Sequence, residues 1–178
     1  MSQLPFLIAV AAFFAILVGV AIYFLLRSRR ATRKAWALIL GRLQQIDRDK
    51  FATVALDLLD EKDAQQPLDP DLIFEMIGGM HGLDALEQNC DVLIDLAAYV
   101  QRWYPEALQL AEELRLNARE IKWHIGRLRG ASQTGHLREQ FPVYAQRAVA
   151  TYYLMTRSLL VLYEGVQLPE YAELQRAL

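Results

Sequence analysis

The sequence predicts an all-α protein in which one N-terminal transmembrane helix precedes a cytoplasmic helical domain. Three observations support this fold class: the first 26 residues carry no charged side chain, later apolar residues recur at helical or heptad spacing, and no stretch shows the alternation of a strand. Of the 178 residues 54% are hydrophobic and one is Cys. This composition excludes a disordered chain and a disulfide scaffold.

Residues 4–26 are expected to form the transmembrane helix, after a short tail at residues 1–3. At about 1.5 Å per residue this stretch spans about 34 Å, enough to cross a hydrocarbon core of about 30 Å. A cleaved signal peptide fits less well, because no positive segment precedes the stretch. Small residues recur at every fourth position, which lets a second transmembrane helix approach closely: Ala11, Ala15 and Gly19.

The segment 27–34 is a basic juxtamembrane segment with five positive charges: Arg27, Arg29, Arg30, Arg33 and Lys34. Positive flanks stay on the cytoplasmic side of an inner-type membrane. We therefore expect the N-terminus outside and the rest of the chain in the cytoplasm, where the unpaired Cys90 is ordinary. The same charges are expected to contact lipid headgroups of the bilayer.

Residues 35–82 are predicted to form an acidic helical connector. One apolar face of a juxtamembrane helix consists of Trp36, Ile39, Leu40, Leu43 and Ile46. A second helix carries Phe51, Val54, Leu58 and Leu59. Asp69 is typical of an N-cap, with Pro70 at the first helical position, and this short helix is expected to end at Gly78 and Gly79.

Residues 83–166 are predicted to form an antiparallel helical bundle or a long helical hairpin. Apolar positions recur every seven residues, the pattern of helices packed at a shallow angle over a long contact. The two sets are Leu83, Cys90, Ala97, Tyr104, Ala111, Ala118 and Ile125, and Leu86, Leu93, Val100, Ala107, Leu114, Ile121 and Leu128. Pro105 interrupts the pattern, so either one long helix kinks there or a second helix begins there.

A chain reversal is expected at residues 130–135, followed by a helix that folds back on the preceding one. Its matching seam consists of Phe141, Ala148, Met155 and Leu162 with Ala145, Tyr152, Leu159 and Val166. Pro169 ends the pattern. Residues 167–178 then remain as a short C-terminal helix.

Charge is distributed unevenly along the helical part of the chain. Residues 47–95 carry a net charge of −10 and residues 96–178 a net charge of +2. An acidic row of like charges, which repel at helical spacing, consists of Asp84, Glu87, Asp91 and Asp95. A basic row of matching spacing consists of Arg115, Arg119, Lys122 and Arg129. We predict that the two rows lie near each other within the fold, or that one of them meets a partner.

The sequence carries no pattern that indicates catalysis or a cofactor. Its three His residues are scattered, the Glu-x-x-His pairs of a di-iron bundle are missing, and one Cys cannot make a thiolate zinc site. No Ser lies in a Gly-x-Ser-x-Gly elbow. The net acidic cytoplasmic part also argues against nucleic-acid binding. We therefore expect a protein that is not an enzyme, with no catalytic, cofactor-binding or metal-binding residue.

The expected function is that of an accessory or scaffold subunit of a membrane-protein assembly, acting through helix-mediated protein–protein contacts. The alternative is a self-associating signalling or structural anchor, a homodimer formed through the small-residue stripe of the span and an exposed heptad seam. Tyr and Arg are favoured at interfaces. The residues expected to dock the partner are therefore the basic row, Arg115, Arg119, Lys122 and Arg129, and the aromatic group Tyr152, Tyr153 and Tyr163.

Overall fold

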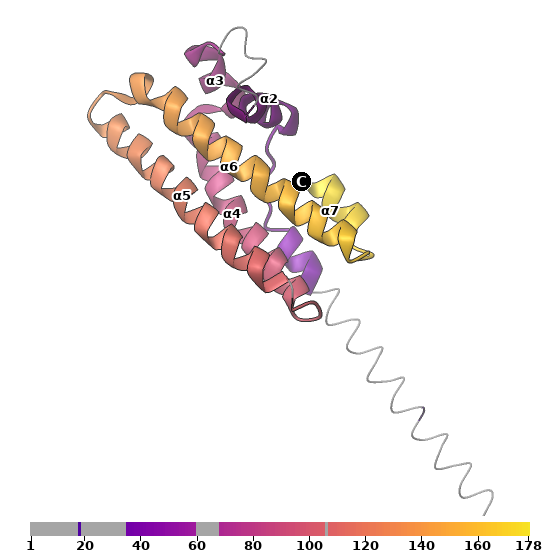
Figure 1. Cartoon of the computed structure of the whole chain (residues 1–178). Helices are drawn as coiled ribbons and strands as arrows, with labels where there is room; N and C mark the ends of the chain where they lie inside the picture. Colours follow the sequence, from indigo (N-terminus) through magenta and orange to yellow (C-terminus); the bar gives the residue numbers. More distant parts are fainter. Residues whose placement is uncertain (1–17, 19–34, 60–67, 106) are drawn as a thin grey trace, which may run out of the picture. The chain divides into compact units, whose positions relative to one another are not determined.

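The computed structural model describes residue 18 and residues 35–59, 68–105 and 107–178. The chain divides into two compact units, Met1–Leu38 and Ile39–Leu178. In the first unit, Val18 and residues 35–38 are helical. The second unit is a helical domain, and the described part of the chain contains no strand (Figure 1). The all-α fold class is therefore confirmed.

Three sequence predictions concern residues that the structure does not describe. The expected span at residues 4–26 lies outside the described residues except for Val18. The small-residue stripe Ala11, Ala15 and Gly19 and the basic segment 27–34 also lie outside them. Within the described ranges, none of the helices combines the length and the apolar character needed to cross a bilayer.

Three long helices form the centre of the domain: α4 (Gly79–Gln101), α5 (Ala107–Gln133) and α6 (Leu137–Gly165). α5 packs along both α4 and α6, and α6 also touches α4. Every residue of the two predicted heptad sets in α4 and α5 is buried, except the half-buried Tyr104. The predicted antiparallel bundle is therefore confirmed, because the heptad positions are the ones that fill its core.

A tight turn at Pro105 separates α4 from α5. α4 ends at Gln101, and the backbone N–H groups of Trp103 and Tyr104 donate to the carbonyl of Val100. Pro105 lacks an N–H and has a fixed φ, both of which suit a residue at the start of a helix. The sequence left open whether one long helix kinks at Pro105 or a second helix begins there. The structure shows the second alternative.

Three shorter helices surround α6: α2 (Arg48–Leu59), α3 (Pro70–Ile77) and α7 (Tyr171–Ala177). All three pack against α6 (Figure 1). The predicted N-cap of α3 is confirmed, because a carboxylate oxygen of Asp69 accepts a hydrogen bond of 2.8 Å from the N–H of Asp71. Gly78 ends α3 with a φ of 79°, a conformation that favours glycine.

The expected juxtamembrane helix is shorter than its apolar pattern predicts. Its helical conformation ends at Leu40, and residues 43–47 are irregular, so Leu43 and Ile46 are not on the predicted helical face. The buried side chain of Asn89 accounts for the difference. Its Oδ1 accepts from the Gln44 N–H at 2.7 Å, and its Nδ2 donates to the Gln44 carbonyl at 2.9 Å. These two bonds replace the helical partners that Gln44 would otherwise use.

Candidate docking surface

The predicted acidic and basic rows meet along the contact between α4 and α5. Lys122 Nζ lies 2.8 Å from Asp91 Oδ1. Arg129 Nη2 lies 2.7 Å from Asp84 Oδ1 and 2.6 Å from Glu87 Oε2. The hydrogen bond to Asp91 raises the pKa of Lys122, and those to Asp84 and Glu87 raise the pKa of Arg129. The prediction that the two rows lie near each other is therefore confirmed.

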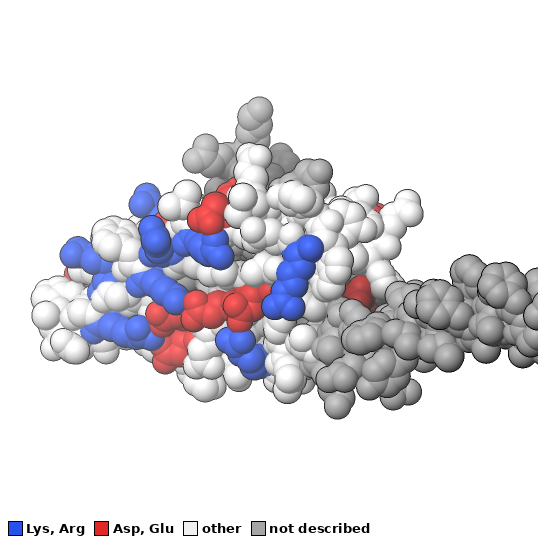
Figure 2. Space-filling model, turned by 90° about the horizontal axis from the view of Figure 1, so that it is seen from below, with Lys and Arg blue, Asp and Glu red and all other residues white. Residues whose placement is uncertain are grey.

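Two members of the rows have other neighbours. Asp95 pairs with Arg42, 2.6 Å away, and Arg115 pairs with Glu112 on its own helix. Figure 2 shows one face on which acidic side chains form a band bordered by basic ones. Arg119 takes part in none of the ion pairs formed within the described part of the chain. Of the basic row, Arg119 therefore has the guanidinium most available to a partner.

The structure corrects the predicted role of two tyrosines. Tyr163 is 0% exposed, and its hydroxyl donates a hydrogen bond of 3.0 Å to the Leu96 carbonyl of α4. Tyr152 is 4% exposed. Burial raises the pKa of both phenols. These two residues belong to the core of the folded domain and not to a docking face, because α6 is surrounded by more helices than a single heptad seam implies. Tyr153 is half-buried.

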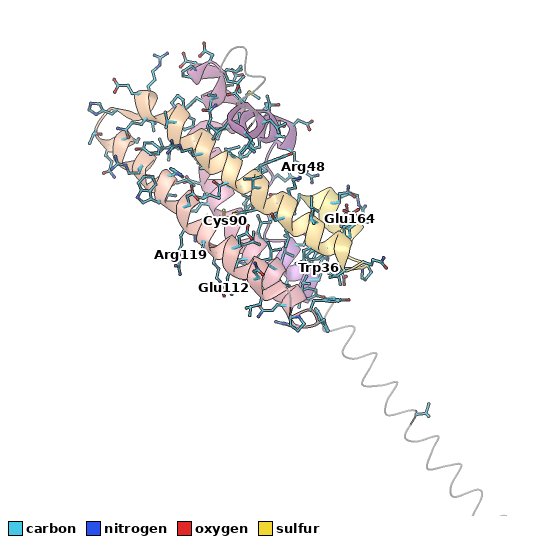
Figure 3. All side chains as sticks on the ribbon, viewed as in Figure 1. Trp36, Arg48, Cys90, Glu112, Arg119 and Glu164 are labelled. Carbon is cyan, nitrogen blue, oxygen red and sulfur yellow. The ribbon has the colours of Figure 1, made fainter. Side chains whose placement is uncertain are left out.

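The outer side of α5 carries a surface that sequence reasoning missed. Leu116 is 62% exposed and Trp123 is 56% exposed, with Arg119 between them at helical spacing. Figure 3 shows Arg119 pointing away from the bundle. We call Leu116, Arg119 and Trp123 the α5 outer face. The available signal was that Leu116 and Trp123 are large apolar residues outside the heptad sets, so they have no place in the seam.

Aromatic contacts hold Trp123 in place. Its ring meets the ring of Tyr144 on α6 edge to face, with 5.8 Å between the two ring centroids. The guanidinium of Arg127 lies over the Tyr144 ring, 5.8 Å from its centroid. An edge-to-face aromatic pair contributes about 0.5–1.5 kcal/mol beyond the area that it buries. Trp123 therefore contacts α6 through one ring while more than half of its surface stays exposed to solvent.

His124 lies beneath this surface and is only 3% exposed. Neither of its ring nitrogens has a hydrogen-bond partner among the described residues, and Glu120 Oε1 lies 3.5 Å from Nε2. Burial lowers the pKa of His124 and outweighs the opposite effect of Glu120. The imidazole is therefore neutral at pH 7.

Two further kinds of group could carry chemistry, namely the thiol of Cys90 and clusters of metal-ligating side chains. Cys90 is buried on the α4 seam, and burial raises the pKa of its thiol to about 12, which leaves the nucleophilic thiolate scarce. Within the described ranges, no group of three or more His, Cys, Asp or Glu residues is arranged to hold a metal ion.

Comparison with known proteins gives no relative for this chain. No protein-family model matches it, and neither a curated protein nor a solved structure matches it significantly.

Proposed function

We propose that this chain is an accessory or scaffold subunit of a membrane-protein assembly and acts through protein–protein contacts rather than catalysis. The observation that carries the proposal is the α5 outer face, where Trp123 and Leu116 are exposed beside Arg119, which forms no ion pair with another described residue. Trp and Arg contribute most often to binding energy at interfaces, especially when they are held rigidly. The partner that fits is a protein surface with an apolar pocket for Trp123 and a carboxylate for Arg119.

The proposal places the domain at a membrane. Residues 4–26 serve as the anchor, with the N-terminus outside and residues 27–178 in the cytoplasm of a cell with an inner-type membrane. The support is the charge-free stretch followed by five positive charges. These charges, on Arg27, Arg29, Arg30, Arg33 and Lys34, also contact lipid headgroups.

Affinity purification tests the docking role. The full chain with a C-terminal tag is extracted from its native membrane in mild detergent, and the proteins that co-purify in fixed ratio are identified. We expect a stoichiometric set of membrane proteins. Trp123→Ala removes the aromatic anchor and should reduce their recovery at least tenfold.

Leu72→Ala, a truncation at an exposed residue of α3, is the matched control and should leave recovery unchanged. Equal recovery with Trp123→Ala and with the control would refute the α5 outer face as the docking surface. Absence of any stoichiometric partner would refute the subunit role itself.

A self-associating anchor is the second candidate, and the repeat of Ala11, Ala15 and Gly19 favours it. In that case the span alone forms the homodimer, because the heptad residues within α4 and α5 are buried in the domain and offer no exposed seam. Gly19→Ile blocks close helix approach, so it should abolish cross-linked dimers in membranes. A heteromeric subunit would keep its partners in the same variant, which separates the two candidates.

A further inference from the structure

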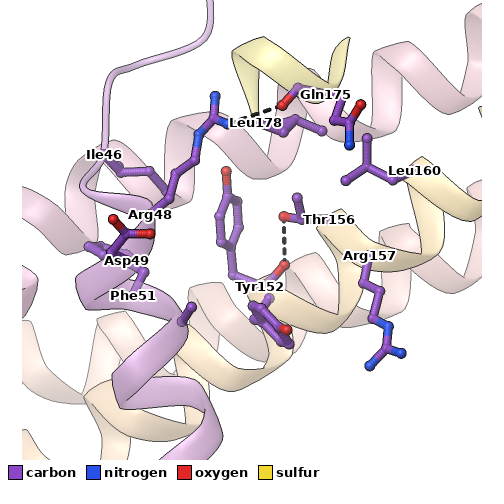
Figure 4. A pocket seen from close by; sticks show the side chains of 12 residues that line it. Ile46, Arg48, Asp49, Phe51, Tyr152, Thr156, Arg157, Leu160, Gln175 and Leu178 are labelled. Carbon is purple, nitrogen blue, oxygen red and sulfur yellow. Dashed lines mark hydrogen bonds between the residues drawn. The ribbon is translucent and has the colours of Figure 1, made fainter. Parts of the chain in front are cut away.

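A pocket opens between the first turn of α2, the middle of α6 and the end of α7. Its volume is about 340 Å³, within the range of sites for small organic ligands. Figure 4 shows the ring of Tyr152 at its centre, with Ile46 and Asp49 on one side and Leu160 and Arg157 on the other. All three helices belong to the same compact unit.

Hydrogen bonds between residues that are distant in the sequence hold the walls of this pocket together. The Arg48 guanidinium donates to the backbone carbonyls of Gln175, at 3.0 Å, and of Arg176. These are terminal carbonyls of α7 that lack partners within their own helix, so Arg48 caps α7 and attaches it to α2. Leu174 is fully buried and anchors the same helix. The pocket is thus formed before any ligand arrives.

The inner lining of the pocket is mainly apolar. It includes the side chains of Ile46, Phe51, Leu160 and Leu178 and the ring of Tyr152. The hydroxyl of Thr156 donates a hydrogen bond of 2.9 Å to the Tyr152 carbonyl, so the Thr156 proton is not available to a ligand. Water in such a space finds few hydrogen-bond partners. An aliphatic body that displaces this water gains free energy in proportion to the apolar area it covers.

The charges at the rim favour an anionic head group. The charged side chains that line the pocket are Arg48, Arg157 and Asp49, and together they carry a net charge of +1. Arg48 is engaged by α7, whereas Arg157 has no ionic partner within the described ranges. A guanidinium matches the geometry of a carboxylate and forms charge-assisted hydrogen bonds with it. Asp49, on the opposite side, repels the same group and so orients the ligand.

We propose that this pocket binds a small amphiphile with a carboxylate head at Arg157 and an aliphatic body on Ile46, Phe51 and Leu160. The proposal goes beyond the docking function and does not depend on it, because no residue of the α5 outer face lines the pocket. It also gives a role to α7, whose end forms one wall.

Hydrogen exchange measured on the full chain in lipid nanodiscs tests the proposal, with octanoate as the probe. We expect octanoate to slow exchange in residues 46–52 and 171–177 in a saturable manner. Octanol and octyltrimethylammonium, which share the chain but not the carboxylate, should bind at least tenfold more weakly. Equal or tighter binding of either would overturn the proposal, and so would an absence of protection by octanoate.

Two variants and one control identify the contacts. Arg157→Gln should weaken octanoate binding about tenfold and leave octanol binding unchanged, because only the charged head is affected. Arg147→Gln removes an exposed arginine of α6 outside the pocket and should change neither. Leu160→Trp fills the pocket and should abolish binding, with circular dichroism confirming that the variant is folded. Unchanged octanoate binding by Arg157→Gln, or protection spread equally over α5, would contradict a specific site.

Discussion

A single hydroxyl connects two core helices at Tyr163. Its hydrogen bond of 3.0 Å to the Leu96 carbonyl is formed in a fully buried environment. Tyr163→Phe keeps the ring and removes the donor, so we expect the free energy of unfolding to fall by about 1 kcal/mol. Urea denaturation of the two proteins measures this difference. A variant as stable as the wild type would mean that the bond contributes nothing net.

His124 is expected to make stability depend on pH. Burial lowers its pKa in the folded state from the ordinary value of 6.5, so the unfolded chain binds a proton more readily than the folded one. Its contribution to stability is full above pH 6.5 and is lost as the pH falls through the lowered folded pKa. His124→Gln should therefore lose less stability than the wild type between about pH 7.5 and pH 5.5.

The exposed His136 provides the control for this comparison. His136→Gln keeps the buried imidazole of His124, so it should follow the wild-type pH profile. Denaturation at a series of pH values gives the profiles. If His124→Gln and the wild type lost stability equally on acidification, the buried imidazole would not be the group responsible.

At the scale of the helix, the heptad pattern predicted which residues of α4 and α5 face the core, because seven-residue spacing and burial are both local properties of a helix. It did not predict the environment of Tyr163, since the number of helices around α6 depends on α2, α3 and α7. Leu43 and Ile46 were misplaced for a similar reason. Their segment is held by Asn89, 45 residues from Gln44 in the sequence, and no local periodicity records that contact.

The close approach of α3 to α4 requires glycine at position 82. A Cβ at Gly82 would lie 1.7 Å from the Ile77 carbonyl oxygen, a backbone atom, so the junction would have to open. We expect Gly82→Ala to destabilise the domain by about 1–3 kcal/mol. Gly126 in α5 has open space around its Cβ position. Gly126→Ala should stabilise by about 0.5–1 kcal/mol, and thermal unfolding of both variants checks the opposite signs.

The ion pairs between α4 and α5 are expected to contribute modestly, because their side chains are about half exposed. Arg129→Gln, which breaks two contacts, should cost at most about 1 kcal/mol at low salt. The cost should shrink in about 1 M NaCl, where charges are screened over about 3 Å. Arg119→Gln removes a charge that pairs with no other residue in the described ranges, so it is the control. Urea denaturation at the two salt concentrations measures both variants, and a salt-independent loss with Arg129→Gln would argue against an electrostatic origin.

At the scale of the whole domain, the two proposed sites lie on different sets of helices. The α5 outer face rests on α5 with support from Tyr144 of α6, whereas the pocket uses α2, α7 and a later part of α6. The sequence contained a partial signal for the first site, since Arg119 stands in the basic row. It held none for the pocket, because the pocket is enclosed only when α7 attaches to Arg48.

This separation predicts that docking and ligand binding vary independently. Trp123→Ala should lose the co-purifying proteins and keep octanoate affinity, while Arg157→Gln should weaken octanoate binding and keep the co-purifying proteins. The double variant should show both losses with no further change, since effects at distant sites that share no partner add. Co-purification and hydrogen exchange on the four proteins form a complete double-mutant cycle. A coupling above about 1 kcal/mol in that cycle would show that α6 transmits the state of the pocket to the α5 outer face. The domain would then be a docking subunit whose affinity for its partner is controlled by the ligand, rather than one whose affinity is constant.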